Sequence, residues 1–125
     1  MKMYEIIDFT NLYEKIKDDK MPLKTAYKFS RLMRYLEKEV GFYQTEFAKV
    51  LQTYAKKDAD GNLAISQDGE SIEIMPGKEV ECNTKILELR NLDVTVEGFE
   101  FTLDELDDLN LTVNEVSCML SLIKE

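Results

Sequence analysis

Apolar side chains between Pro22 and Lys57 recur with an unbroken helical period. No proline interrupts this stretch, and Gly41 is its only glycine. Alternating steps of three and four residues place side chains along one face of a helix, as in helices that pack at a shallow angle. The residues of this seam are Ala26, Phe29, Met33, Leu36, Val40, Tyr43, Phe47, Val50 and Tyr54. The sequence therefore predicts one continuous helix of about 54 Å.

The seam needs a partner, and we expect the chain to supply it. Additional apolar side chains widen the seam beyond a two-helix stripe, and aromatic residues at four seam positions suit a regular parallel dimer poorly. We therefore expect the long helix to pack antiparallel on shorter helices, although a dimer through this helix stays open beside a monomer. The expected shorter helices cover residues 10–18, 78–92 and 113–124, with one further turn near 103–108.

A β-hairpin is expected after the long helix. Residues 58–62, Asp-Ala-Asp-Gly-Asn, have the composition of a turn that ends the helix. Apolar and polar residues then alternate on both sides of Asp68-Gly69, as in two paired strands. The alternating apolar residues are Leu63, Ile65, Ile72 and Ile74. Val94 and Val96 are candidates for a third strand of this sheet.

Two capping boxes mark helix starts near the C-terminal end. Phe101-Thr-Leu-Asp-Glu-Leu106 and Leu111-Thr-Val-Asn-Glu-Val116 each place threonine three residues before glutamate. In this arrangement the threonine and glutamate side chains accept hydrogen bonds from two otherwise unpaired backbone amides. Flanking apolar residues occupy the staple positions of both helices.

These elements predict an α+β, mostly helical fold that forms a single domain over residues 1–125. Its expected parts are an N-terminal helical region (1–57), a turn and hairpin (58–77), and a helix, strand and C-terminal helix (78–125). The long helix is central, and the hairpin lies at one end.

The residue inventory argues against common catalytic chemistries. The chain has no histidine and no tryptophan, which removes the usual Ser/His and Cys/His nucleophiles and most transition-metal sites. Cys82 and Cys118 form no metal or redox motif. A calcium loop is disfavoured because, counted from Asp58, Gly61 occupies the fourth position instead of the sixth. We therefore expect a non-catalytic protein without a cofactor or metal.

Neither a membrane span nor a signal peptide is expected. No run of about 18 apolar residues occurs, and the first 15 residues mix acidic with apolar side chains. An intracellular, cytoplasmic location is the simplest interpretation of these features and of the isolated cysteines.

Charge is unevenly distributed and suggests two candidate binding surfaces. Residues 1–57 carry a net charge of +4 and residues 58–125 a net charge of −13. The basic candidates, at helical spacing along the long helix, are Lys24, Lys28, Arg31, Arg34 and Lys38. The acidic candidates are Glu97, Glu100, Asp104 and Asp107.

Each candidate surface has several interpretations. The basic stripe fits phosphates, an acidic protein, the wet face of a long helix, or a dock for the chain's own acidic half. The acidic residues fit mimicry of a nucleic-acid backbone or simply solubility. Binding of nucleic acid is disfavoured by the overall net charge of −9.

Several segments resemble a family of small uncharacterised proteins encoded by phages and prophages of Gram-positive and gut bacteria. They are Met21-Pro-Leu-Lys-Thr-Ala-Tyr-Lys28, Leu36-Glu-Lys-Glu-Val40, Lys57-Asp-Ala-Asp-Gly-Asn62 and Leu109-Asn-Leu-Thr-Val-Asn-Glu-Val116. The resemblance covers most of the chain, through motifs that are structural. It implies a viral or prophage origin and expression in the cytoplasm of the bacterial host, and it transfers no catalytic residue.

Together these observations favour a phage-encoded protein that binds another protein, either a phage structural protein or a host factor. The leading hypothesis is an accessory or assembly factor. One alternative is an inhibitor of a host defence or nucleic-acid-binding enzyme, acting through the acidic C-terminal half. Another is a weak nucleic-acid-binding module that uses the basic stripe.

Overall fold

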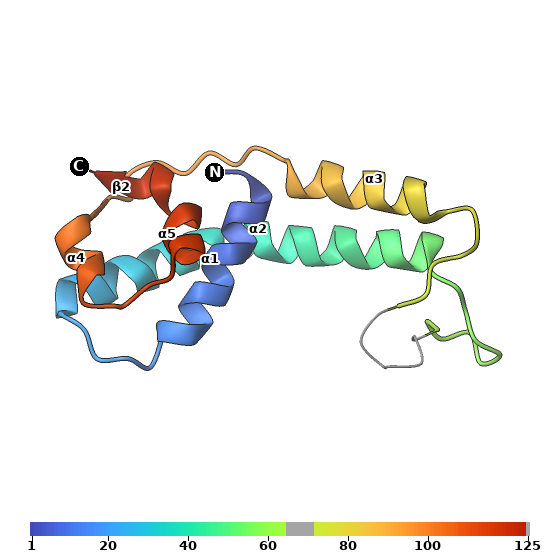
Figure 1. Cartoon of the computed structure of the whole chain (residues 1–125), viewed down its shortest axis with the longest axis horizontal. Helices are drawn as coiled ribbons and strands as arrows, with labels where there is room; N and C mark the ends of the chain where they lie inside the picture. Colours follow the sequence, from blue (N-terminus) through green and yellow to red (C-terminus); the bar gives the residue numbers. More distant parts are fainter. Residues whose placement is uncertain (65–71, 125) are drawn as a thin grey trace. The chain divides into compact units, whose positions relative to one another are not determined.

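The computed structural model describes residues 1–64 and 72–124, and most of these residues are helical (Figure 1). Its α-helices are α1 (Met3–Ile16), α2 (Leu23–Tyr54), α3 (Glu79–Arg90), α4 (Leu103–Asp107) and α5 (Val113–Cys118). A short 3-10 helix, η1 (Leu120–Leu122), precedes the last strand. Strands β1 (Phe101–Thr102) and β2 (Ile123–Lys124) pair in parallel, with Phe101 opposite Ile123. The α+β, mostly helical fold predicted from the sequence is confirmed.

Helix α2 is continuous, as the apolar period predicts. It passes through Gly41 without a break and ends at Tyr54, three residues before the expected end at Lys57. Ala55 follows, is buried, and forms an antiparallel bridge with Ile74. The helix therefore ends where the backbone begins to pair with an extended segment.

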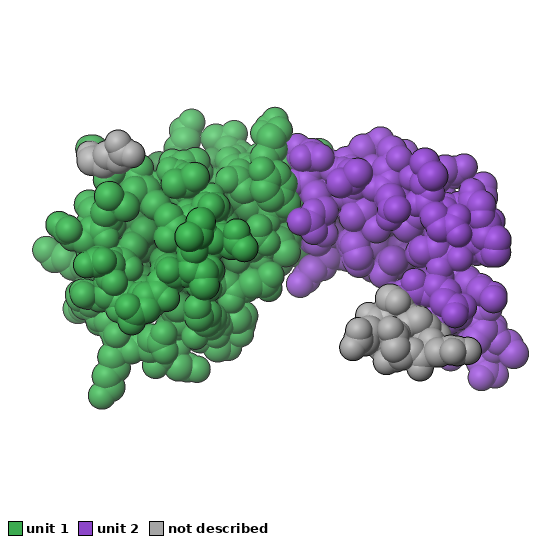
Figure 2. Space-filling view, viewed as in Figure 1, with its two compact units in different colours: residues 1–41, 92–125 green, residues 42–91 purple. Residues whose placement is uncertain are grey.

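The chain forms two compact units, coloured separately in Figure 2. The first comprises residues 1–41 and 92–125, and the second comprises residues 42–91. The boundary falls within α2, directly after Gly41. The buried side chains of α2 lie in the first unit and are Thr25, Phe29, Leu32 and Leu36. Beyond this unit, the seam residues of α2 are only partly buried.

Three aromatic rings form the centre of the first unit. Phe29 of α2 stacks on Phe9 of α1, with ring centroids 6.0 Å apart. It also contacts Phe101 of β1 at 4.8 Å. The buried face of α1 adds aliphatic side chains at Met3, Ile6, Leu12 and Ile16. Helix α1 begins at Met3, seven residues before the expected start at Thr10. It crosses α2 instead of lying along it (Figure 1).

Residues 1–3 pair with residues 92–94. The Met1 ammonium donates a hydrogen bond to the Val94 carbonyl at 2.9 Å, and the Val94 amide donates to the Met1 carbonyl at 2.8 Å. Lys2 and Asp93 form an antiparallel bridge and a 2.9 Å ion pair. The sequence indicates a third strand of the hairpin at Val94 and Val96, but the structure pairs Val94 with Met1 instead, and Val96 belongs to no strand.

The second unit combines the end of α2 with α3, which runs antiparallel beside it (Figure 1). In α3, Cys82 is buried and Ile86 and Leu89 are partly buried on the same face. Extended residues next to α2 and α3 form isolated pairs, including a 2.9 Å hydrogen bond from the Glu73 amide to the Ala64 carbonyl. This bond fits the expected hairpin, whose turn and Ile65 lie outside the described residues.

Both predicted capping boxes are present at the starts of α4 and α5. The Thr102 amide donates to Glu105 at 2.9 Å, and the Glu105 amide donates to the Thr102 hydroxyl at 3.2 Å. Thr112 and Glu115 repeat the arrangement at 2.8 and 3.1 Å.

The terminal helix is shorter than the expected 113–124. Helix α5 ends at Cys118, and Ile123 is extended opposite Phe101. The apolar residues after Cys118 fit a helical period, but pairing with β1 gives the backbone of Ile123 and Lys124 hydrogen-bonding partners outside a helix. Met119 and Leu122 are buried in this connection.

Replacing Gly41 with alanine is expected to stabilise the protein. Gly41 is exposed in the middle of a helix, and no atom lies within 4 Å of the added Cβ position. Alanine favours a helix interior over glycine by about 1 kcal/mol. Urea unfolding should show Gly41→Ala more stable by about that amount, and Ala48→Gly, at another exposed position of α2, less stable. A Gly41→Ala protein no more stable than the parent contradicts an unstrained continuous helix.

Candidate functional site

One face of α2 in the first unit is exposed and combines apolar with basic side chains. We define the outer face as Leu23, Tyr27, Arg34 and Lys38. Leu23 is 84% exposed and Tyr27 is 64% exposed, while Arg34 and Lys38 are also exposed. At about 100° per residue, these four positions lie within about 60° of one another around the helix axis. They point away from the buried stripe that contains Phe29.

The chain's own segment 95–105 covers the neighbouring flank of α2. The Tyr35 hydroxyl donates a hydrogen bond to the Thr95 carbonyl at 2.8 Å. The Tyr35 ring lies 5.0 Å from the Phe99 ring, and the Arg31 guanidinium lies over Phe99 at 4.8 Å. Arg31 also donates to the Gly98 carbonyl at 3.4 Å. A tyrosine and an arginine of α2 therefore hold an aromatic residue and the extended backbone beside it.

Lys28 continues this contact toward α4. Its ammonium group lies 2.7 Å from Glu105 Oε1 and 5.8 Å from the centroid of Phe101. The hydrogen bond from Lys28 holds the pKa of Glu105 below its usual range, partial burial of the carboxylate opposes this, and the bonds from Thr102 assist it. Glu105 thus serves both the ion pair with α2 and the capping box of α4.

The structure brings part of the basic stripe together with part of the acidic cluster. Lys24 and Lys28 line one surface hollow with Asp104. Lys28 and Arg31 line a second hollow with Glu100 and Phe101. One interpretation of the stripe is that it contacts the chain's own acidic half. Lys28 and Arg31 make such contacts.

The remaining predicted site residues stay apart from this contact. Among residues 1–64 and 72–124, the side chains of Arg34 and Lys38 make no hydrogen bond or ion pair, and the same holds for the side chains of Glu97 and Asp107. Glu100 pairs with Lys124 at 3.7 Å, with both side chains largely exposed. The predicted stripe therefore has two parts. Lys28 and Arg31 contact segment 95–105, whereas the side chains of Arg34 and Lys38 have no partner among the described residues.

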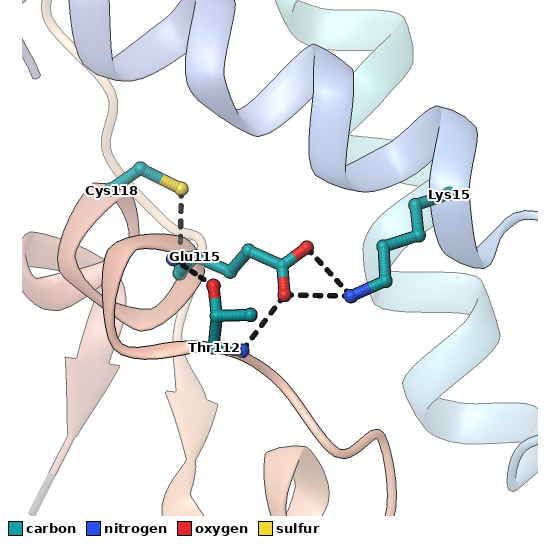
Figure 3. A network of polar contacts seen from close by, with 4 residues as sticks. All are labelled: Lys15, Thr112, Glu115 and Cys118. Carbon is teal, nitrogen blue, oxygen red and sulfur yellow. Dashed lines mark hydrogen bonds and ion pairs between the residues drawn. The ribbon is translucent and has the colours of Figure 1, made fainter.

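A polar network joins α1 to α5 (Figure 3). The Lys15 ammonium donates to both carboxylate oxygens of Glu115, at 2.8 and 3.0 Å. Thr112 supplies the capping contacts to the same glutamate. The hydrogen bond from Lys15 is the main cause of the lowered pKa of Glu115. The Glu115 carboxylate therefore stabilises both the start of α5 and the contact between α5 and α1.

A groove of about 460 Å³ lies between these two helices, with Cys118 in its wall. The Cys118 thiol is buried and donates to the Glu115 carbonyl at 2.9 Å. Burial, with the nearby carboxylates Asp8, Glu5 and Glu115, raises the pKa of Cys118 to about 12. The thiol is therefore protonated and weakly nucleophilic. The sequence did not predict the groove, because the two helices that form it are about 100 residues apart along the chain.

In the turn after α2, the Asp58 side chain is hydrogen-bonded to the backbone of the turn itself. The Asp58 carboxylate accepts hydrogen bonds from the amides of Asp60 and Asn62, each at 2.9 Å. Gly61 has a φ of 81°, which suits glycine. This geometry is the turn expected from the sequence. Among the described residues, no group of three or more acidic or cysteine side chains is placed to hold a metal ion.

The Lys28–Glu105 pair should contribute to stability in a pH-dependent way. Because the folded-state pKa of Glu105 is lowered, the contribution is present above the unfolded-state pKa, about 4.3, and is lost as pH falls through the folded-state pKa. Glu105→Gln retains a capping acceptor and should cost about 0.5–1 kcal/mol at pH 7, with a smaller cost near pH 3. Urea unfolding at both pH values measures this. Glu100→Gln, in an exposed pair, is the control with almost no effect, and an equal cost at both pH values contradicts the electrostatic origin.

Cys118 should resist thiol reagents in the folded protein. At a pKa of about 12, on the order of one molecule in 10,000 carries the reactive thiolate at pH 8, and the sulfur is also buried. A Cys82→Ser protein isolates this thiol. A disulfide reagent at pH 8 should label it slowly in buffer and at once in guanidinium chloride. Rapid labelling in buffer would contradict the buried position.

Comparisons of the chain with protein-family models, with curated proteins and with solved structures find no match. The function is therefore inferred from the geometry of the described residues.

Proposed function

We propose that this chain is a non-catalytic, phage-encoded protein that binds another protein, as an accessory or assembly factor. The outer face of α2 is the observation that carries this proposal. It presents an aliphatic and an aromatic side chain, Leu23 and Tyr27, one helical turn apart and exposed by 84% and 64%. Arg34 and Lys38 lie on the same side of the helix.

The composition of the outer face is that of a protein-binding surface. A single exposed apolar side chain is ordinary on a folded protein. An exposed tyrosine beside an exposed arginine is less common, because binding energy in interfaces concentrates on tryptophan, tyrosine and arginine side chains, and the outer face has Tyr27 and Arg34. The rigid helix also holds these groups in place before binding, which limits the entropy lost on association.

A non-catalytic role agrees with the ionisation of the side chains. The sequence has no histidine, so acid–base catalysis near neutral pH requires a carboxyl group of raised pKa or a similarly shifted side chain. Where a shift is resolved for a carboxyl in the described residues, it is downward, at Asp93, Glu105 and Glu115. Such groups stay ionised at neutral pH and do not act as general acids there.

The phage origin rests on the resemblance of the sequence to small phage and prophage proteins, which implies no particular activity. The assembly role is the binding role that we propose for a protein of this origin. A helical surface with exposed apolar residues suits that role.

An inhibitor of a host enzyme is the second candidate function. Glu97, Asp104 and Asp107 are exposed and form no ion pair within the described residues, so their charge is available to a basic surface. Nucleic-acid binding by the basic stripe is less favoured because Lys28 is paired with Glu105 and the chain has a net charge of −9.

Affinity purification with outer-face variants tests the binding role. The tagged full chain serves as bait in extracts of phage-infected and uninfected bacteria. The parent chain should retain a virion protein, and Leu23→Ser with Tyr27→Ser should reduce the retained amount about tenfold, since truncating a hot-spot side chain costs about 2 kcal/mol or more. The matched control is Val80→Ser with Leu87→Ser, two similarly exposed residues of α3, and it should retain the protein.

The same baits separate the two candidate functions. Reversal of Glu97, Glu100, Asp104 and Asp107 to lysine should abolish retention of a host nuclease or defence enzyme if the acidic half acts as an inhibitor. Retention of capsid or tail protein by this variant supports the assembly role. If no protein depends on either surface, both candidate functions are wrong.

A further inference from the structure

The contact between α2 and segment 95–105 shows which kind of chain segment this helix can hold. Tyr35 contacts Thr95 and Phe99, Arg31 contacts Phe99, and Lys28 contacts Phe101 and Glu105. The segment therefore runs antiparallel to α2. Its aromatic rings meet a tyrosine and cationic groups, and its carboxylate meets a lysine.

The outer face repeats this chemistry on the adjacent side of α2. Tyr27 corresponds in type to Tyr35, and Arg34 and Lys38 correspond to Arg31 and Lys28. Leu23 adds an aliphatic contact. Within the described residues no chain segment makes a hydrogen bond or ion pair with the side chains of Arg34 or Lys38. On the flank these side chains are therefore in contact with segment 95–105, whereas on the outer face the cationic side chains have no partner among the described residues.

The dimensions suit a short extended segment. Leu23 and Lys38 are fifteen residues apart on α2, or about 22 Å at the rise of an α-helix. About seven residues in extended conformation span this distance. Charge complementarity then requires acidic residues opposite Arg34 and Lys38, with an aromatic or aliphatic residue opposite Tyr27.

A segment of a protein fits this face better than a polyanion does. The net charge of −9 repels nucleic acids and anionic membranes over long range. An exposed carboxylate, Glu37, also lies on α2 beside the outer face. A short acidic segment carries its charge locally and brings apolar groups for Leu23 and Tyr27.

We propose that the outer face of α2 binds an extended, acidic segment of a partner protein that contains aromatic residues. This rests on the proposed function and assigns the chemistry of the partner. The contact uses the same types of group that hold residues 95–105, in the reverse order along α2. Aromatic rings lie over Tyr27 and Arg34, and carboxylates lie at Arg34 and Lys38.

The experiment measures peptide binding to the full chain by fluorescence anisotropy. The probe is a labelled peptide with the sequence of residues 95–105, Thr-Val-Glu-Gly-Phe-Glu-Phe-Thr-Leu-Asp-Glu. Its matched control replaces the four acidic residues with glutamine or asparagine. The acidic peptide should bind the parent chain about tenfold more tightly than the neutral one, and raising the salt concentration should reduce this difference.

Variants of the chain assign the binding to the outer face. Arg34→Glu with Lys38→Glu should lower the affinity for the acidic peptide by about tenfold or more, and Tyr27→Ser should lower it by about tenfold. Lys49→Glu with Lys56→Glu makes the same charge change in the second unit and should alter binding less than about twofold. If the two double variants lower the affinity for the peptide equally, the effect comes from the total charge of the chain, and the inference is wrong. Peptide binding that none of these variants weakens also overturns it.

Competing occupants and the proposed function are tested separately. Vesicles of phosphatidylserine and phosphatidylcholine, and a 20-nucleotide uridine RNA, are measured at the same salt concentration. Tighter binding of either, lost in the Arg34→Glu and Lys38→Glu variant, overturns a protein segment as the occupant. If the purification yields a partner but the peptide does not bind, only the partner chemistry is wrong. If the peptide binds but no partner is retained, the proposed function is wrong.

Discussion

Phe29 lies on the buried stripe of α2 between two other rings, Phe9 of α1 at 6.0 Å and Phe101 of β1 at 4.8 Å. Burying a phenylalanine side chain contributes about 1.5–3 kcal/mol, and each ring pair adds about 0.5–1.5 kcal/mol. These contacts join segments about 20 and 70 residues away along the chain. They also fix the rotation of α2 about its axis, so Leu23 and Tyr27 are left facing outward.

The distribution of charge follows from the same packing. With Phe101 held against Phe29, the residues on either side of β1 lie along the flank of α2, where Glu105 meets Lys28 and Phe99 meets Arg31. The acidic and basic parts of the chain therefore partly neutralise each other at this contact. The basic groups farther around the helix remain unpaired among the described residues, which is why the proposed binding surface lies there.

The polar groups inside the first unit serve the fold. Glu105 and Glu115 each accept bonds from a capping threonine and from a lysine of another helix, Lys28 and Lys15 respectively. Each carboxylate thus combines a local role with a tertiary one. Cys118 is buried with a raised pKa, so it too is a packing residue.

Features that depend on neighbouring residues could be predicted from the amino-acid sequence alone. The apolar period predicted α2, and threonine three residues before glutamate predicted the starts of α4 and α5, because helices and caps form through contacts within a few residues. Long-range packing, by contrast, determines that Val94 pairs with Met1 and that Ile123 is extended opposite Phe101. It also determines that the Lys28 side chain is paired, whereas the Arg34 side chain has no partner among the described residues. Those outcomes depend on which distant segments compete for the same backbone groups and the same face of α2, and no local pattern records that competition.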